Sequence, residues 1–298
     1  MRTHPFKADL LLILVTLLAA LSWIFSKEVL VGLPPMLFMG LRFFTAGLLL
    51  AAFSIGDLRR FHARDTGRVF LVGAVFAVGI TFWVFGLHLG THMGVGGFLT
   101  SMGALLAPLI AIFFGERAGR ALWLALPIAC AGLAALSLDS HFVFGIGEWS
   151  YLASALFFAI FINLSARAAV KTSVIALTAI QLVTVGLLLI PISWFFENWE
   201  LVNMYGIWGW FAASALLGSA ARFLIQTYSF KLAPAGHGAL VLTLEPVWVA
   251  IFAAIWYGER MEPMQLLGCL LIFIAVLTTR AKSIYAYAQA LRQAKQAR

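Results

Sequence analysis

Two residues of opposite charge, Arg222 and Glu245, stand inside long apolar stretches of this sequence. A charge at the centre of a lipid bilayer costs between about 2.5 and more than 10 kcal/mol, depending on the reference state, so such residues demand a partner or a function. Arg222 can take a carboxylate or a phosphate, and Glu245 can hold an amine or carry a proton. Apolar surroundings favour the neutral acid, whereas a neighbouring arginine favours the carboxylate. A substrate that displaces Arg222 would therefore change the proton affinity of Glu245.

The connection between the two stretches predicts that these charges meet. A tight turn at Ala233-Pro234 joins them, and Arg222 precedes that turn by as many residues as Glu245 follows it. In an antiparallel hairpin both lie roughly 12–16 Å from the inner end, at 1.5 Å per residue, near the middle of a core about 30 Å thick. We expect them to pair or to share a water-filled cavity. The alternative is that the pair only fastens the hairpin.

Further polar and aromatic residues are candidates for the same site. Arg42 lies roughly 9 Å from the outer end of its apolar stretch, so it can snorkel to the surface or contribute to the site. Asn163 and Gln226 face a cavity or bond to a neighbouring helix. The aromatic residues deep in their stretches line the cavity or pack against lipid. The expected substrate-binding residues are Glu245, Arg222, Trp23, Arg42, Trp83, Phe82, Asn163 and Gln226, with Glu245 as the proton-coupling residue.

The sequence offers little for metal, nucleotide or enzymatic chemistry. His88 and His92 have the spacing of two ligands on a helix face, but Gly90 interrupts that face and no carboxylate or cysteine completes a site. The two cysteines stand alone in apolar stretches and have no metal or disulfide spacing. A Walker-type glycine loop is absent from the sequence. We therefore expect no metal, no cofactor and no enzymatic activity.

The composition identifies the elements that must position these residues. Of 298 residues, 63% are hydrophobic and 11% are charged, whereas soluble domains have about 45–50% apolar and 25% charged residues. A net charge of +8 is spread over short loops and the C-terminal tail, so it does not form a nucleic-acid footprint. We expect an all-α integral membrane protein with ten transmembrane helices. The expected spans are 9–31, 36–55, 69–89, 95–114, 119–138, 149–169, 174–195, 206–230, 236–257 and 263–279.

The distribution of the cations predicts the orientation of these spans. Cytoplasmic loops of membrane proteins are enriched in lysine and arginine. With the N-terminus inside, most of the 20 cations fall on the cytoplasmic side, which predicts cytoplasmic N- and C-termini in the inner membrane of the cell. The inside set is Arg2, Lys7, Arg59, Arg60, Arg64, Arg68, Arg117, Arg120, Arg167, Lys171, Lys231, Arg280, Lys282, Arg292, Lys295 and Arg298.

An internal repeat divides the chain into two halves. The segment 42–51 recurs at 181–190, where Thr45, Gly47 and three leucines return 139 positions later. Two Gly-Glu-Arg triplets, 115–117 and 258–260, end the fourth and the ninth span. Each half then holds five spans, and because five is odd, the second half must cross the membrane in the opposite direction. Inverted repeats of this kind are common in secondary transporters.

These features carry a resemblance to the EamA-type transporters of the drug/metabolite transporter superfamily. The matching motifs are Leu41-Arg42-Phe43, Ala20-Leu21-Ser22-Trp23, Ala107-Pro108, Glu245-Pro246 and the two Gly-Glu-Arg triplets. The resemblance implies one EamA-like five-helix repeat at 1–140 and a second, inverted one at 141–281, and the rest of the chain, 282–298, is a basic cytoplasmic tail. The halves differ at one point, because Met102-Gly103 stands in the first where Glu245-Pro246 stands in the second.

The resemblance implies secondary active transport of small polar or amphipathic metabolites by alternating access. We expect a proton-coupled exporter of substrates such as amino acids, because a zwitterion would use both Arg222 and Glu245. The alternative is efflux of lipophilic organic cations, for which Glu245 and aromatic residues suffice. The expected partners are the small-molecule substrate and the lipid bilayer, without nucleic acid, and a homodimer is left open.

Overall fold

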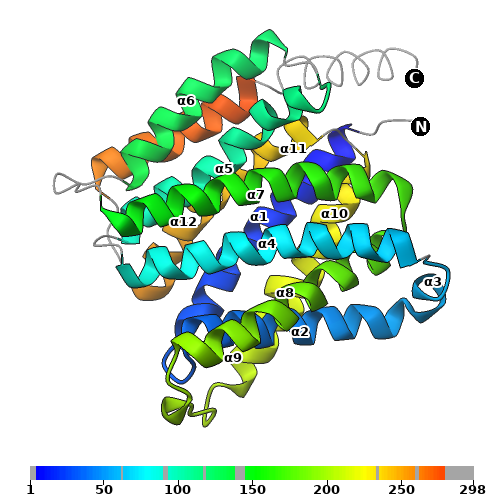
Figure 1. Ribbon diagram of the computed structural model, residues 1–298. Helices are drawn as coiled ribbons and strands as arrows, with labels where there is room; N and C mark the ends of the chain where they lie inside the picture. The colour runs from blue at the N-terminus through cyan, green and yellow to red at the C-terminus, as the bar shows by residue number, and fades with distance from the viewer. Residues whose placement is uncertain are drawn as a thin grey trace, which may run out of the picture.

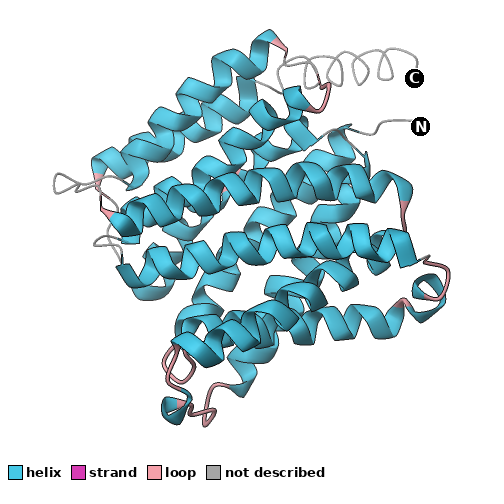
Figure 2. Cartoon of the chain, in the orientation of Figure 1, coloured by secondary structure: helices cyan, strands magenta, loops and turns pink. Residues whose placement is uncertain are grey.

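The computed structural model describes residues 5–61, 63–89, 93–116, 119–137, 145–232, 235–258 and 262–278, and the regular elements of these residues are all helical (Figures 1 and 2). The basic tail at 282–298 lies outside them. The helices are α1 (Pro5–Val29), α2 (Pro35–Phe53), α3 (Ile55–Leu58), α4 (Ala63–Leu89), α5 (Met93–Phe113), α6 (Arg120–Ser137), α7 (Ile146–Lys171), α8 (Val174–Phe196), η1 (Trp199–Leu201), α9 (Trp208–Ala213), η2 (Ser214–Ala221), α10 (Arg222–Leu232), α11 (Ala235–Leu242) and α12 (Glu245–Tyr257). A last apolar helix covers Pro263–Thr278.

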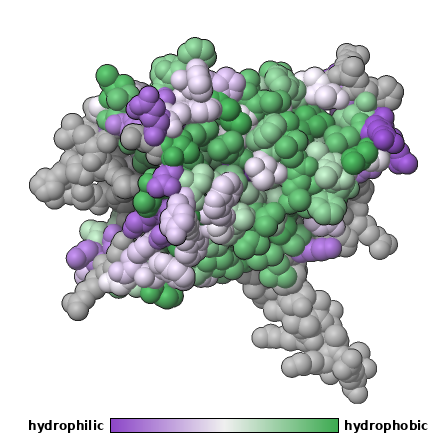
Figure 3. Space-filling view, turned by 90° about the horizontal axis from the view of Figure 1, so that it is seen from below, coloured by the Kyte–Doolittle hydropathy of each residue, from purple (hydrophilic) through white to green (hydrophobic). Residues whose placement is uncertain are grey.

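These helices are built for a membrane. Among the described residues, seven helices are long and apolar enough to cross a bilayer, and three shorter apolar helices cover Leu99–Phe113, Arg120–Ala135 and Pro263–Thr278. Each of the ten expected spans overlaps one of these helices. Seven of the helices are long and apolar enough to cross a membrane, and the other three are shorter. Large apolar side chains such as Phe113 and Leu71 are exposed, and Figure 3 shows apolar residues over the middle of the molecule with hydrophilic ones toward its two ends. Apolar surface of this extent marks a lipid-facing protein.

Helices α2 and α8 pack against each other more extensively than any other described pair. Glycines allow their backbones to approach. A Cβ built on Gly40 would lie 2.8 Å from a side-chain carbon of Ile190, and one on Gly47 would lie 2.5 Å from the backbone nitrogen of Val183. Because the contact on α8 moves backward along the chain as the position on α2 moves forward, the two helices run antiparallel. Small residues at such crossings are typical of membrane helix pairs.

A carboxylate at the end of α8 ties the same two helices together. Glu197 accepts hydrogen bonds from the backbone N–H groups of Met36 (2.7 Å) and Leu37 (2.8 Å), and from the hydroxyl of Ser193 (2.6 Å). The first N–H groups of a helix have no partner within the helix. Glu197 therefore satisfies the start of α2, where a negative charge also interacts favourably with the helix dipole.

An aromatic core joins α10 to three other helices. Phe76 of α4 stacks on Phe161 of α7 with ring centroids 4.3 Å apart, and its centroid lies 5.2 Å from that of Phe223 of α10. Phe43 of α2 meets Phe76 at 5.5 Å and Phe223 at 5.7 Å, both edge-on. Aromatic pairs of this geometry contribute about 0.5–1.5 kcal/mol each beyond their buried area. They fix the position of α10 next to its first residue, Arg222.

The expected eighth span is a helix with an irregular centre. It runs from Trp208 to Leu232, but residues Ser214–Ala221 form a π-helix, η2, between α9 and α10. The backbone N–H of Arg222 bonds back to the carbonyl of Leu217, five residues earlier. The sequence SALLGSAA contains mainly small residues, which offer little steric resistance to the wider winding. π-Helical turns occur frequently at functional sites.

The expected ninth span is broken in the middle. Helix α11 ends at Leu242, residues Thr243 and Leu244 form a turn, and α12 begins at Glu245. Pro246 explains the break, because proline has no N–H for the carbonyl four residues earlier and its ring clashes with that carbonyl. The hydroxyl of Thr243 instead donates to the carbonyl oxygen of Leu240 at 2.7 Å. The break turns Glu245 into the first residue of a new helix.

Candidate functional site: a buried ion pair between two irregular helices

Arg222 and Glu245 form an ion pair. A terminal guanidinium nitrogen of Arg222 donates to Glu245 Oε2 at 2.9 Å. The two side chains are 20% and 23% exposed, so neither is fully buried. The sequence prediction that these residues pair is therefore confirmed.

The irregular backbone explains where both charges sit. Arg222 is the first residue after the π-helix η2, and Glu245 is the first residue of α12. The N-terminus of α12 carries a partial positive charge, which favours a carboxylate at that position. The Arg222 Cζ lies over the Phe223 ring, 5.1 Å from its centroid, so the ring face supports the guanidinium. Discontinuous helices of this kind form substrate sites in many secondary transporters.

Two tryptophans complete the environment of Glu245. The indole Nε1–H of Trp23, from α1, donates to Glu245 Oε1 at 3.2 Å, so each carboxylate oxygen has one donor. Trp83, from α4, meets the Trp23 ring edge-on with centroids 5.9 Å apart. The predicted residues Glu245, Arg222, Trp23 and Trp83 are thus brought together from four helices.

Arg222 has an unused donor. Among the described residues, its buried Nε–H has no hydrogen-bond partner. A buried unpaired donor costs about 1–3 kcal/mol, and more when the group is charged. The arrangement would be relieved by an acceptor such as a carboxylate or phosphate oxygen, which matches the chemistry expected for Arg222.

Arg42 does not snorkel. The residue is 4% exposed, so that part of the sequence interpretation is wrong. Its Nε donates to the Ser219 hydroxyl at 2.5 Å, one terminal nitrogen donates to Ser26 at 3.0 Å, and the other to Ser22 at 2.7 Å and to the carbonyl of Gly218 at 2.9 Å. The depth of Arg42 is possible because these neutral groups satisfy most of its donors.

The four groups that bond to Arg42 form a serine cage that was not foreseen from the sequence. Its members are Ser22, Ser26, Gly218 and Ser219. A Cβ on Gly218 would collide with the Ser22 side chain and lie 3.1 Å from a terminal nitrogen of Arg42, so only glycine permits the approach to this carbonyl. The signal was present in the small residues Gly218 and Ser219, but their partners lie far away along the chain. The cage links α1 and α2 to η2.

Arg42 and the ion pair form one electrostatic unit. Arg42 bonds to Gly218 and Ser219 of η2, and Arg222 follows η2 directly, so the three charged groups lie in one region of the bundle. Two guanidinium groups and one carboxylate leave an excess of one positive charge in this unit. Since a charge in an apolar interior is costly, the unit favours a ligand that brings a negative group.

The remaining predicted residues have packing contacts. Phe82 stacks on Phe157 with centroids 5.8 Å apart. Asn163 is buried and donates to the carbonyls of Ala107 at 2.8 Å and Ala159 at 2.9 Å, which is the expected alternative of a bond to a neighbouring helix. Gln226 is buried on α10, one turn after Arg222. Their roles in substrate binding stay predictions.

Of the two histidines with ligand spacing, His92 lies outside the described residues. Within the described part of the chain, no three His, Cys, Asp or Glu residues are grouped as metal ligands. Cys130 and Cys269 are free cysteines.

One contact of the Arg42 cage is repeated at the equivalent positions in the other half of the chain. Gln181 stands 139 positions after Arg42, and Ser165 stands 139 positions after Ser26. Gln181 Nε2 lies 3.3 Å from the Ser165 hydroxyl, as the Arg42 guanidinium lies 3.0 Å from that of Ser26. The same contact is therefore built twice, once with a charge and once with an amide.

Sequence comparison places the chain among known proteins. The profile of the EamA-like transporter family matches it twice, at residues 6–138 and 145–281. The chain belongs to this family. Similar proteins include the uncharacterized transporter YvbV of Bacillus subtilis (strain 168), 24% identical over 93% of this chain and 92% of the relative. An uncharacterized transporter of Archaeoglobus fulgidus is 27% identical over 91% of this chain and 84% of its own.

A solved structure has the same fold. A protein crystal structure superposes with a TM-score of 0.80 over 94% of this chain and 98% of the other, at 18% sequence identity. At this identity the likeness extends to the fold alone. Together with the family, it identifies a multi-pass membrane protein of transporter type.

Proposed function

We propose that this EamA-like protein is a secondary active transporter that binds a small metabolite with a negative and a positive group, such as an amino acid, at the Arg222–Glu245 pair. The observation that carries the proposal is the ion pair itself, held where a π-helix ends and a broken helix begins. A zwitterion would exchange one ion pair for two, with its carboxylate on Arg222 and its amine on Glu245. The unused Nε–H of Arg222 would supply the second donor of a bidentate contact.

Glu245 is the proposed proton-coupling residue. Arg222 and Trp23 each donate a hydrogen bond to one of its oxygens. A substrate carboxylate that takes over Arg222 removes one of these donors and raises the tendency of Glu245 to bind a proton. Binding of substrate and binding of a proton are thereby linked at one residue. The direction that we assign to transport is export from the cytoplasm.

The proposed architecture is ten membrane spans in two inverted repeats, 1–140 and 141–281, with both termini in the cytoplasm. The antiparallel contact of α2 with α8 supports it, as do the two matches to the family profile. Figure 1 adds that α5 ends on the side of α3, whereas α12 ends on the other side. Two similar halves of opposite orientation would give inward-open and outward-open states of similar energy, which alternating access requires.

A second substrate class is favoured by the tryptophans. Trp23 bonds to the carboxylate of Glu245, and Trp83 packs against Trp23. Aromatic rings with a carboxylate are suited to lipophilic organic cations. Arg222 opposes this assignment, because its positive charge would have to move away from the cation. We therefore place organic cations second.

A competition experiment in proteoliposomes distinguishes the two classes. Uptake of a radiolabelled amino acid would be measured against unlabelled amino acids and against organic cations, with and without a pH gradient. The proposal requires that amino acids compete and that the gradient drives accumulation. Competition by organic cations alone would replace it with the second class.

A further inference from the structure

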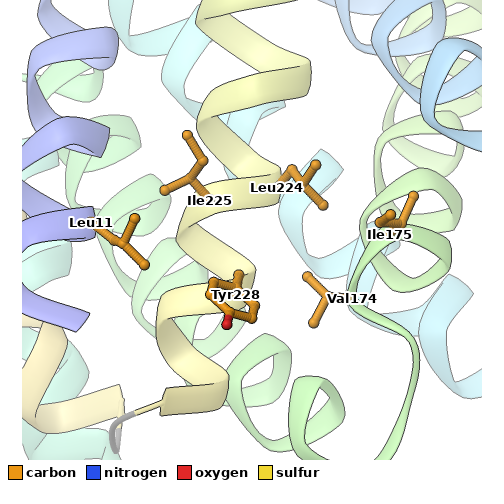
Figure 4. A pocket seen from close by; sticks show the side chains of 6 residues that line it. All are labelled: Leu11, Val174, Ile175, Leu224, Ile225 and Tyr228. Carbon is orange, nitrogen blue, oxygen red and sulfur yellow. The ribbon is translucent and has the colours of Figure 1, made fainter. Parts of the chain in front are cut away.

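A groove whose lining does not include the ion pair lies between α1, α8 and α10. It has a volume of about 310 Å³ and is lined by Leu11, Val174, Ile175, Leu224, Ile225 and Tyr228. Figure 4 shows these side chains around one space, with Leu11 on one wall and Val174 and Ile175 on the opposite wall. All are aliphatic except Tyr228. Neighbouring leucines of α1, Leu10 and Leu14, are 53% and 41% exposed, so this flank of the bundle faces lipid.

Each of the three helices that line the groove, α1, α8 and α10, has a lysine within it or shortly before it, near the same end of the groove. Lys7 precedes Leu11 by one helical turn, Lys171 precedes Val174 by three residues, and Lys231 follows Tyr228 by three residues. Helix α10 runs antiparallel to α1, so all three lysines belong to the end at which α1 and α8 begin and α10 ends. The Lys7 ammonium lies 5.6 Å from the centroid of the Tyr228 ring, which brings this cation to the groove itself.

Three aspartates of this end have other partners or directions than the groove. Asp65 pairs with Arg68 at 3.6 Å. Asp9 is two residues from Leu11, and at about 100° per residue it points away from the face that Leu11 and Lys7 share. Asp57 accepts a hydrogen bond from the Ser173 hydroxyl at 2.5 Å. The hydroxyl of Tyr228 points toward the C-terminal end of α10 (Figure 4).

We propose that this groove binds an anionic phospholipid, with one acyl chain along the apolar walls and the phosphate at Lys7, Lys171 and Lys231. The apolar length and the cationic end match the two parts of such a lipid. Basic sites between membrane helices on the cytoplasmic side are suited to anionic headgroups. The site does not depend on the substrate proposed for Arg222 and Glu245, because it shares no residue with them. Arg222 is the first residue of α10, whereas Lys231 lies in its last turn.

The test is native mass spectrometry of the purified full chain with phosphatidylglycerol or phosphatidylcholine of identical acyl chains. We expect the wild type to retain phosphatidylglycerol preferentially. An anionic headgroup gains about 1 kcal/mol for each nearby lysine, so each of Lys7→Gln, Lys171→Gln and Lys231→Gln should weaken phosphatidylglycerol binding about fivefold. Binding of phosphatidylcholine should not change.

Two further variants separate the headgroup from the groove. Ile225→Trp fills the groove and should lower the retention of both lipids, whereas Leu106→Trp, in an apolar groove between α5 and α6, should leave it unchanged. Arg120→Gln removes an exposed cation of α6 and serves as the charge control. Inorganic phosphate is added as a competitor, and displacement of the lipid by phosphate alone would reduce the site to a simple anion site.

Equal retention of both lipids by the wild type would overturn the proposal. So would an unchanged preference after the three lysine substitutions, or an equal loss after Arg120→Gln. If Ile225→Trp abolished transport without changing lipid retention, the groove would be a path for substrate instead. Circular dichroism and size-exclusion profiles confirm that each variant is folded before it is compared.

Discussion

Gly47 of α2 and Gly186 of α8 make reciprocal contacts. A Cβ on Gly47 would lie 2.5 Å from the backbone nitrogen of Val183, and a Cβ on Gly186 would lie 2.5 Å from the Cβ of Phe44. Gly186 stands 139 positions after Gly47, and Val183 stands 139 positions after Phe44. Each helix therefore offers its partner the same surface, as in a two-fold symmetric interface.

The first prediction concerns this interface. Gly47→Ala should destabilise the protein by about 1–3 kcal/mol, because the added methyl group overpacks a contact that backbone atoms cannot easily leave. The measurement is thermal unfolding in detergent, followed by tryptophan fluorescence. Gly97→Ala is the matched control, since a Cβ at Gly97 would meet nothing within 4 Å. Equal melting temperatures for the two variants would contradict the packing argument.

The second prediction concerns the coupling between Arg222 and Glu245. A double-mutant cycle with Arg222→Ala, Glu245→Ala and the double variant should give a coupling energy of about 1.5–3 kcal/mol, the range for a charge-assisted hydrogen bond. The double variant should unfold at a higher temperature than either single variant, because each single change leaves one charge without its partner. Additive effects of the two changes would rule out a stabilising pair.

The third prediction concerns proton coupling. Glu245→Gln keeps an oxygen that can accept from Arg222 but cannot exchange a proton. Accumulation driven by a pH gradient should therefore be lost, whereas exchange of substrate at equal pH should continue. Both are measured in proteoliposomes, with Glu262→Gln, which removes an exposed carboxylate, as the control. Gradient-driven accumulation that survives in Glu245→Gln would assign coupling to another group.

The fourth prediction concerns the Arg42 cage. Arg42→Gln reproduces the residue found at the equivalent position 181, so it should fold. It should be less stable by about 1–3 kcal/mol, because glutamine cannot reach all four acceptors of the guanidinium. Arg42→Met, which leaves all four without this donor, should be less stable still. Thermal unfolding measures both, and a methionine variant as stable as the wild type would show that the cage does not stabilise the fold.

The sequence predicts the helices and the ion pair well, for physical reasons. Apolar length sets where a helix can lie in lipid, and a short turn fixes which residues of a hairpin face each other. The predicted pairing of Arg222 with Glu245 depends only on these two rules. The family resemblance, carried by motifs such as Glu245-Pro246, is confirmed by the double match of the family profile.

The irregular helices and the serine cage could not be predicted in the same way. Hydropathy does not register a change in winding at Ser214–Ala221, since it depends on the residue types and not on how the backbone winds. The break before Glu245 has a visible cause in Pro246, but apolar length alone predicts one continuous span over 236–257. Arg42 bonds to Ser219, 177 positions away, and a contact between such distant residues has no local pattern to reveal it.

The π-helical segment gives α10 a property that a regular helix would lack. One residue corresponds to about 100° of rotation in an α-helix. If Ser214–Ala221 rewound to the tighter form with one residue fewer in the bulge, α10 would turn by that angle about its own axis and carry Arg222 away from Glu245. The same rotation would take Phe223 out of its contacts with Phe43 and Phe76, so rewinding this segment would change the ion pair and the aromatic core together.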